Sequence, residues 1–267
     1  MFPHFFLTLS SIKCLLNSRT RVYHKEMLNY VILVAALLPA VILMIIVLVR
    51  DKEHPEPVPW ILKGLLYGVY AIFASLLISQ PLIAIGVVPE DYTNALSATW
   101  YSFGAAAIPE ETAKLLFLWL LLRKNPYFDE YFDGIVYAVC VGLGFAAFEN
   151  VMYLFNAEDG WPLLAVMRGL LAVPAHFFFA VLMGYYYSVA RFGHNPKRNY
   201  IMMWAVPVLA HGIYDAIAMT SDVSESAQGL LSIALLLFCN ELRKLCQRHV
   251  KELLTADQSV YNKNPFA

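Results

Sequence analysis

Hydrophobic residues along this chain fall into about seven long runs separated by short polar connections. A helix needs about 20 mostly apolar residues to cross the hydrocarbon core of a bilayer, and the runs approach or exceed that length. The pattern therefore predicts an all-α protein, a polytopic membrane bundle of about seven spans. The runs are Leu28–Val49, Trp60–Ile85, Leu96–Leu122, Phe132–Phe155, Trp161–Ala190, Tyr200–Thr220 and Ala227–Leu245.

The connections are too short to separate folded units, so we expect one transmembrane domain over residues 27–250 and a cytoplasmic tail over 251–267. Residues 1–26 form an N-terminal extension that includes Lys13, Arg19, Arg21 and Lys25. Its apolar part, Phe2–Leu16, is too short to span a bilayer. We interpret the extension as an interfacial helix or as sequence upstream of a natural start at Met27.

Lysine and arginine gather in alternate connections, which predicts the orientation of the bundle. Basic residues follow the first, third, fifth and seventh runs, whereas the other connections carry acids and no Lys or Arg. Basic loops face the cytoplasm, so the pattern indicates an outer N-terminus and a cytoplasmic C-terminus.

Composition narrows the class further. Hydrophobic residues make up 60% of the chain and charged residues 15%, against roughly 45–50% and 25% in soluble domains. A net charge of −1 offers no basic surface for nucleic acid. The four cysteines lack metal-binding spacing, and we interpret them as free thiols. An ordinary soluble enzyme is excluded, and we expect a multi-pass protein of the cell membrane with the lipid bilayer as a partner.

Ionisable and polar residues nevertheless interrupt four of the runs. Such residues are costly inside a membrane and usually mark a functional site. At about 1.5 Å per residue, those of the third to sixth runs lie at a similar depth, on the outer side of the midplane. The candidates are Glu110, Glu111, Lys114, Glu149, Asn150, His176, His211 and Asp215. We interpret Arg168 as an interfacial anchor, and Asp129, Glu130 and Asp133 as a solvated loop with a helix cap.

Local spacing predicts some of the contacts. Glu110 and Lys114, like His211 and Asp215, are four residues apart and share a helix face. Glu110 and Glu111 differ by about 100° around the axis, so we do not expect both to face one partner.

Backbone features next to these residues predict local distortion and close packing. Pro109 and Pro174 precede the polar positions and are expected to disturb the helices there. Small residues recur at every fourth position of the fourth run, which favours close contact with a neighbouring helix. They are Gly134, Ala138, Gly142 and Ala146.

The order and spacing of these motifs resemble the PrsW family of intramembrane proteases, which is related to CAAX prenyl endopeptidases and bacteriocin-processing enzymes. The resemblance covers roughly residues 30–245. The residues that carry it are Glu110-Glu111-x-x-Lys114, Phe145-x-x-x-Glu149-Asn150, His176 and His211-x-x-x-Asp215, together with the stretch from Phe132 to Tyr153.

The resemblance implies hydrolysis of a peptide bond in a membrane-anchored protein substrate. In bacterial relatives this substrate is an anti-sigma factor that is cut on its outer side. The CAAX-processing relatives have a histidine in the second motif, where this chain has Glu149.

The chemistry of amide hydrolysis suggests a role for each residue. Glu110 or Glu111 is the expected general base, and His211, oriented by Asp215, stabilises the oxyanion or protonates the leaving amine. Glu149 and His176 complete the pocket. Asn150 and Lys114 are expected to support the substrate or the oxyanion.

Two questions stay open at the level of sequence. No metal is required by the spacing, but Glu149, His176 and His211 are suitable zinc ligands. The same buried set also suits a non-enzymatic protein, either a proton- or ion-coupled transporter or a scaffold that binds membrane proteins.

Overall fold

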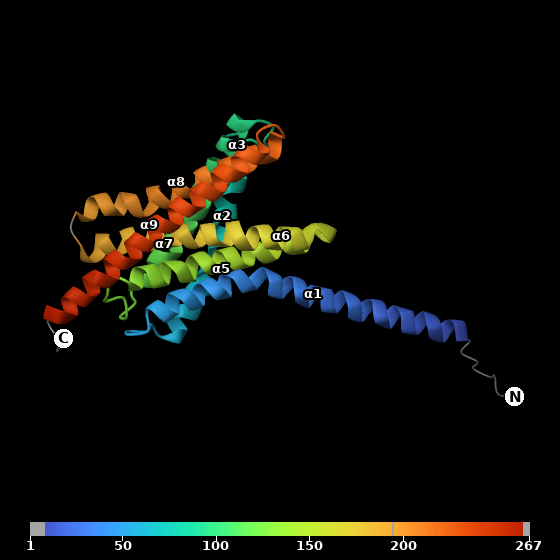
Figure 1. Ribbon diagram of the computed structural model, residues 1–267, viewed down its shortest axis with the longest axis horizontal. Coiled ribbons are helices and arrows are strands. Elements are labelled where there is room, and N and C mark those ends of the chain that lie inside the picture. Colours follow the sequence, from blue (N-terminus) through green and yellow to red (C-terminus); the bar gives the residue numbers. More distant parts are fainter. Residues whose placement is uncertain (1–8, 194, 264–267) are drawn as a thin grey trace.

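The computed structural model describes the backbone of residues 9–193 and 195–263 and the side chains of residues 26–193 and 195–259. All regular structure in these ranges is helical, as the hydrophobic pattern predicts (Figure 1). The elements are α1 Leu9–Arg50, α2 Val58–Ala84, α3 Ala95–Tyr101, η1 Ser102–Ala107, α4 Ile108–Leu122, α5 Asp133–Asn156, η2 Glu158–Gly160, α6 Trp161–Met167, η3 Arg168–Ala172, α7 Val173–Phe192, α8 Pro196–Val223 and α9 Gln228–Lys263.

Each predicted span corresponds to a helix or to a continuous series of helices. The third is α3–η1–α4 and the fifth is α6–η3–α7, and in both a short π-helical segment joins two α-helices. Five helical segments are long and apolar enough to cross a membrane. The third predicted span is not among them because it carries three charged residues, Glu110, Glu111 and Lys114, and charged residues exclude α9 in the same way.

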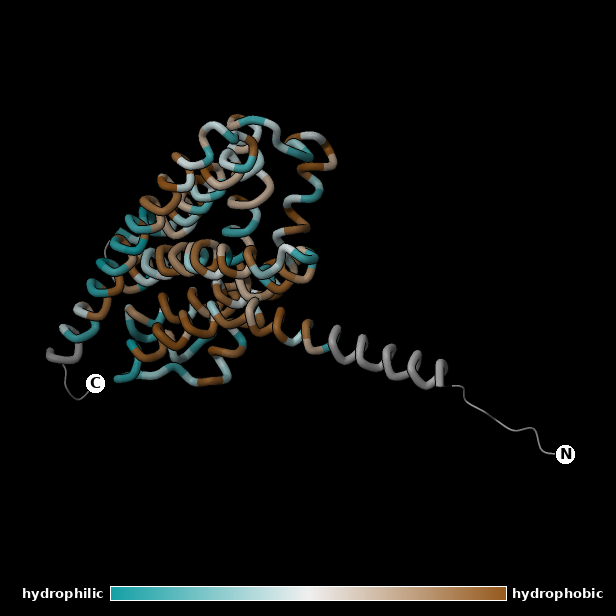
Figure 2. Tube along the Cα trace, turned by 45° about the vertical axis from the view of Figure 1, so that its right-hand side comes forward, coloured by the Kyte–Doolittle hydropathy of each residue, from teal (hydrophilic) through white to brown (hydrophobic). Residues whose placement is uncertain are grey.

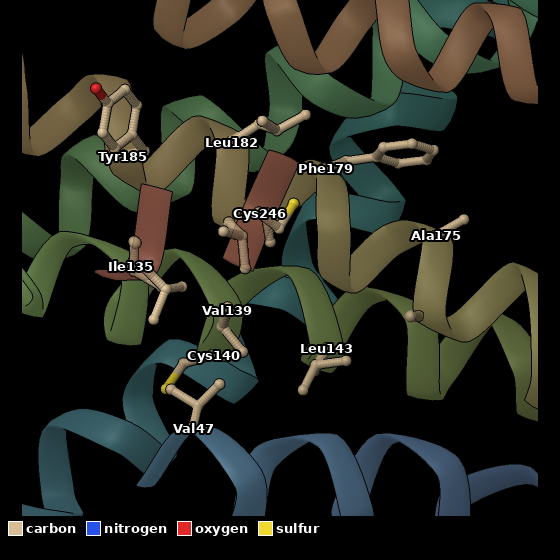
Figure 3. Packing of buried hydrophobic residues seen from close by; sticks show 14 of the residues in the cluster. Val47, Ile135, Val139, Cys140, Leu143, Ala175, Phe179, Leu182, Tyr185 and Cys246 are labelled. Atoms are coloured by element: carbon tan, nitrogen blue, oxygen red, sulfur yellow. The ribbon is translucent and has the colours of Figure 1, made fainter. Parts of the chain in front are cut away.

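Helix α5 is the centre of the bundle. Every residue from Phe132 through Ala146 is buried, so this part of the helix is enclosed on all sides, as expected for a core position. It packs against α2, α7 and α1. Figure 3 shows Val139 and Leu143 of α5 lying between Val47 of α1 and Phe179 of α7.

The outer surface of the bundle is strongly apolar. Large hydrophobic side chains are exposed along α1, α2, α8 and the first half of α9. Brown, hydrophobic segments recur throughout the bundle in Figure 2. A soluble protein rarely leaves apolar patches of this extent uncovered. This surface suits acyl chains, and the protein is a multi-pass membrane protein.

Helix α9 continues to Lys263, well beyond the predicted end of the span at Leu245. The predicted domain boundary at residue 250 therefore falls inside a helix. Asp257 accepts hydrogen bonds from the backbone N–H groups of Tyr131 at 2.8 Å and Phe132 at 2.9 Å. At the other end of the chain, the predicted extension is helical from Leu9 and continuous with the first span, while residues 1–8 lie outside the described residues.

The connections that carry lysine and arginine meet at one end of the bundle. His54 lies 3.3 Å from Glu130, and the Tyr131 hydroxyl donates to the carbonyl of Phe192 at 2.7 Å. The predicted orientation places this end in the cytoplasm, and that assignment stays a prediction.

The prediction that Asp133 is solvated is wrong. This residue is 1% exposed and accepts hydrogen bonds from the N–H groups of Asp129 and Glu130 at 3.0 and 2.6 Å. It lies in the first turn of α5, so it ties the preceding loop to the helix instead of capping it. The neighbouring pair of Tyr137 and Glu56, which hydrogen-bond to each other, helps to exclude water there.

Small residues on α5 allow neighbouring helices to approach closely. The predicted stripe packs against α7, where Gly134 faces Gly184 and Gly142 faces Ala180. A second close contact was not predicted: a Cβ atom on Gly144 would overlap the carbonyl oxygen of Leu65 in α2.

We expect Gly144→Ala to destabilise the protein by roughly 1–3 kcal/mol, because the added methyl group forces α2 and α5 apart. Gly229→Ala is the matched control, since nothing lies within 4 Å of the position of its Cβ atom. Thermal unfolding in detergent measures both. Equal stability of the two variants would contradict the close α2–α5 contact.

Asp51 lies at the end of the bundle where the connections with lysine and arginine meet, which we call the basic end, and it provides a pH-dependent prediction. Burial and the nearby carboxylate of Glu56 raise the pKa of Asp51 to about 7, with smaller contributions from Glu130 and Asp257. Between about pH 4 and pH 7 the folded state holds a proton that the unfolded chain has released, so this group's contribution to stability falls as the pH rises.

We therefore expect Asp51→Asn to raise the unfolding temperature at about pH 8 and to raise it less at about pH 5. Thermal unfolding at both pH values measures the difference. Glu53→Gln, a change of an exposed acid in the same loop, is the control and should have no effect at either pH. An equal effect of Asp51→Asn at both pH values would rule out this ionisation as the cause.

Candidate active site

Two π-helical segments, each followed by a proline, precede Glu110 in the third span and His176 in the fifth. Segment η1 ends at Ala107, before Pro109 and Glu110, and η3 ends at Ala172, before Pro174 and His176. Proline lacks an N–H group and disfavours regular i→i−4 bonding, which fits the wider turn that precedes it. The predicted distortion at both prolines is thus present.

Lys114 links the two acids of α4 to α7. Its Nζ atom lies 2.8 Å from Glu111 Oε1, 3.2 Å from Glu110 Oε2 and 3.1 Å from His176 Nδ1. The ammonium has three N–H donors, and each has an acceptor. The ring of Phe145 lies 3.9 Å from Nζ and covers a further side of the group. The expectation that Glu110 and Glu111 would not share a partner is therefore wrong.

His211 is held by acids on two helices. Nδ1 lies 2.8 Å from Glu111 Oε1 in α4, and Nε2 lies 3.1 Å from Asp215 Oδ2 in α8. The ring stacks on Phe179 with a centroid distance of 4.8 Å. The predicted pairing of His211 with Asp215 is confirmed, and the contact with Glu111 joins α8 to α4.

The position of His211 also depends on contacts between α8 and the third span. The hydroxyl of Ser102 donates to the carbonyl of Gly212 at 3.1 Å, and Trp204 Nε1 donates to Thr112 Oγ1 at 2.9 Å. A Cβ atom on Gly212 would overlap the ring of Phe103, so a larger residue there would force that ring to move.

The contacts of His176 determine its tautomer. Because an ammonium only donates, Nδ1 of His176 must accept from Lys114. Nε2 then carries the ring proton and donates to Glu149 Oε2 at 3.1 Å. Lys114 and Glu149 thus hold His176 from opposite sides.

Arg168 belongs to this network, and its interpretation as an interfacial anchor is wrong. Its Nη2 atom lies 2.6 Å from Glu149 Oε2, and Nε donates to Asn150 Oδ1 at 2.8 Å. The guanidinium also lies 3.8 Å from the ring centre of Tyr153. A charged residue within a hydrophobic run, eight residues before His176, is a sequence signal that would have identified Arg168 as part of the network.

Asn150 is buried, and both ends of its amide are occupied. The nitrogen donates to the carbonyl of Ala36 in α1 at 2.8 Å, while the oxygen accepts from Arg168. In this structure the side chain connects α1, α5 and η3 and is not free to bind a substrate.

A cavity of about 670 Å³ lies beside the network. Six residues of the network line it: Glu110, Glu149, Arg168, His176, His211 and Asp215. Glu111 and Lys114 lie behind this wall and are almost fully buried. The predicted site residues thus come together, with Glu110 at the cavity and Glu111 beneath it.

Four residues have donor atoms that lie within 4.8 Å of one another and suit a divalent cation by type: Glu110, Glu111, His176 and His211. The predicted ligand set shares both histidines, but Glu149 does not belong to this group. Glu111 Oε2 is buried without a hydrogen-bond partner among the described residues, as a ligand oxygen would be.

The ammonium of Lys114 argues against a metal in this arrangement, because it already contacts three of the four residues. Two unit charges 4 Å apart repel by about 4 kcal/mol at an effective dielectric constant of about 20, and a dication doubles this value. The residues as arranged therefore do not fit a metal ion.

Comparison with known proteins supports a proteolytic site. Residues 56–239 match the family model described as "PrsW family intramembrane metalloprotease". The chain is similar to Protease PrsW of Geobacillus kaustophilus (strain HTA426), with 33% identity over 205 residues, covering 75% of this chain and 85% of that protein. No solved structure matches the chain.

Two further relatives carry the same name. Protease PrsW of Clostridioides difficile (strain 630) is 34% identical over 188 residues, covering 69% of this chain and 77% of the relative. Protease PrsW of Bacillus subtilis (strain 168) is 32% identical over 193 residues, covering 70% and 83%.

Arg168→Met should destabilise the protein by roughly 1.5–3 kcal/mol, because it removes charge-assisted hydrogen bonds from Glu149 and Asn150. Arg168→Lys should recover part of the loss, since lysine restores the charge but not the two-pronged geometry. Thermal unfolding reports both.

Arg191→Met is the control for the loss of an arginine from the same span, because Arg191 is exposed at the end of α7. We expect a change within about 0.5 kcal/mol for this variant. A network role for Arg168 is refuted if both methionine variants unfold at the same temperature.

Proposed function

The chain belongs to the PrsW family of intramembrane proteases, and on that basis we propose that Glu110 activates water to cleave a membrane-anchored protein substrate. One observation carries the proposal: carboxylates and imidazoles from four spans meet at the wall of one cavity. Amide hydrolysis needs an activated water, a stabilised oxyanion and a proton for the leaving amine, and these groups can provide all three.

Exposure to the cavity favours Glu110 over Glu111 as the general base. Glu110 Oε2 contacts Lys114, while its Oε1 accepts no hydrogen bond from the described residues. This free oxygen can take a proton from a water molecule in the cavity. Glu111 is fully buried and contacts both Lys114 and His211. Glu111 is therefore the positioning residue of the pair.

His211 and Asp215 act on the oxyanion and the leaving group. Both residues line the cavity, and Asp215 holds Nε2 of His211. A ring fixed between two carboxylates and stacked on Phe179 is held in one orientation, and Nε2 would have to leave Asp215 to donate its N–H group to the oxyanion or the leaving amine. We assign His211 to oxyanion stabilisation or to protonation of the leaving amine.

Glu149 and Arg168 position His176 at the wall of the cavity. The guanidinium and the imidazole both bind Glu149 Oε2, and Asn150 fixes the guanidinium in turn. Asn150 therefore supports the pocket through Arg168, and Lys114 supports it by holding the acids and His176.

The substrate class follows from the family and from the location of the cavity. A membrane-anchored protein whose cleavage site lies towards the outer side of the bilayer fits the predicted orientation, and an anti-sigma factor is the candidate that the family suggests. The family description includes a metal, but three residues of the four-residue group that would hold it already bind the ammonium of Lys114.

The proposal predicts that Glu110→Gln lowers proteolysis by at least about 100-fold, the scale of general-base catalysis, while stability is retained. Glu111→Gln should lower both proteolysis and stability, because Glu111 Oε1 holds two partners. Proteomic comparison of membrane-protein N-termini in cells with each variant measures cleavage, and thermal unfolding measures stability.

Asp222→Asn is the matched control, since Asp222 also lines the cavity from α8 but lies outside the network. Cells with this variant should show the same set of membrane-protein N-termini as cells with the wild-type protein. Unchanged cleavage in Glu110→Gln, Glu111→Gln and His211→Ala would refute the peptidase, and proton flux would then test the transporter alternative. Loss of cleavage in Glu111→Gln alone would reverse the assignment of the base.

A further inference from the structure

We infer that Lys114 is the built-in cation of this site and that a divalent metal can bind the cluster only when its ammonium is absent. The inference rests on one observation: the residues that bind the ammonium are largely the residues that could bind a metal ion. The three contacts of Nζ are to Glu110, Glu111 and His176, which are three of the four residues with metal-ligand spacing.

The surroundings of Nζ match an ammonium group in number and kind. Three acceptors receive its three N–H donors, and the face of Phe145 lies on a further side. An aromatic face binds an organic cation well but supplies no lone pair for coordination. Arg168 binds Glu149, and Glu149 in turn contacts His176, so a second positive charge lies near the group.

The tautomer of His176 also argues against coordination of a metal ion in this arrangement. Nδ1 accepts from Lys114 and Nε2 donates to Glu149, so neither nitrogen has a free lone pair. Both nitrogens of His211 are occupied as well, but by carboxylate oxygens, with Nδ1 at Glu111 and Nε2 at Asp215. A metal ion would have to displace Lys114 and break these contacts before either histidine could coordinate it.

The fourth residue of the group is tied to Lys114 through a shared atom. Glu111 Oε1 contacts both Lys114 Nζ and His211 Nδ1. One ammonium thus organises carboxylates and imidazoles from three helices, which is the structural task of a metal in a metalloprotease. This inference rests on the proposed function only for its catalytic meaning, because the competition for the site is a matter of binding.

The test measures metal binding in the full-length protein in detergent. Each variant is incubated with zinc sulfate, desalted and analysed by plasma mass spectrometry, and Co²⁺ is used as a spectroscopic probe of the ligands. The wild-type protein and Lys114→Arg, which keeps a cation, should retain less than about a tenth of an ion per chain. Lys114→Ala and Lys114→Met should bind about one ion per chain.

Thermal unfolding supplies a second readout. Zinc should raise the unfolding temperature of Lys114→Ala and Lys114→Met, because the metal replaces the lost charge, and should leave that of Lys114→Arg unchanged. The double variant Lys114→Ala/His211→Ala should lose the gained ion, which excludes binding elsewhere. If Lys114→Ala does not fold, the wild-type, arginine and methionine proteins still decide the question.

Stoichiometric metal in the wild-type protein that disappears in His211→Ala would overturn the inference, as would no gain of metal in either neutral Lys114 variant. Cleavage by the wild-type protein in the presence of EDTA is expected to persist. A complete absence of cleavage, with the predicted metal binding intact, would refute the proposed function and leave the built-in cation standing.

Discussion

The site depends on the ion pairs that one lysine makes inside an apolar bundle. Two adjacent carboxylates behind a hydrophobic wall are costly unless a cation neutralises them. Lys114 reaches both from one turn further along α4, and its third donor joins His176 on α7. Without this ammonium, Glu110 and Glu111 would repel each other, and the link between α4 and α7 would be lost.

Close contacts between helices fix the relative positions of these charged side chains. Glycines on α5 bring α2 and α7 near the central helix, and Gly212 brings α8 against η1. The π-helical segments lie just before Pro109 and Pro174, and Glu110 and His176, which follow these prolines, line the cavity. Packing and backbone irregularity thus act together, since a regular helix would shift the side chains beyond each segment around the axis.

The sequence was sufficient for the fold class, the helical runs and the pairs within one helix. Spacing of four residues predicted Glu110 with Lys114 and His211 with Asp215, because such residues share a face. Contacts between helices, such as Glu111 with His211, depend on the rotation of each helix and could not be derived from spacing.

Two errors have a common origin in side-chain length. Glu110 and Glu111 differ by about 100° around the helix axis, which suggested different partners. Lys114 follows Glu111 by three positions and Glu110 by four, and its long side chain reaches both. Arg168 was likewise assigned to the interface, although its long side chain reaches Glu149 and Asn150.

Helix α9 has 36 residues, and proline is absent from it, so it is a rod of about 54 Å. Gln228 and Ser232 near its start line the cavity, while Asp257 near its end holds the loop before α5. A tilt of this rod cannot be absorbed by a hinge along its length. One unbroken helix thus connects the loop before α5, at the end of the bundle where the basic connections meet, with the wall of the cavity.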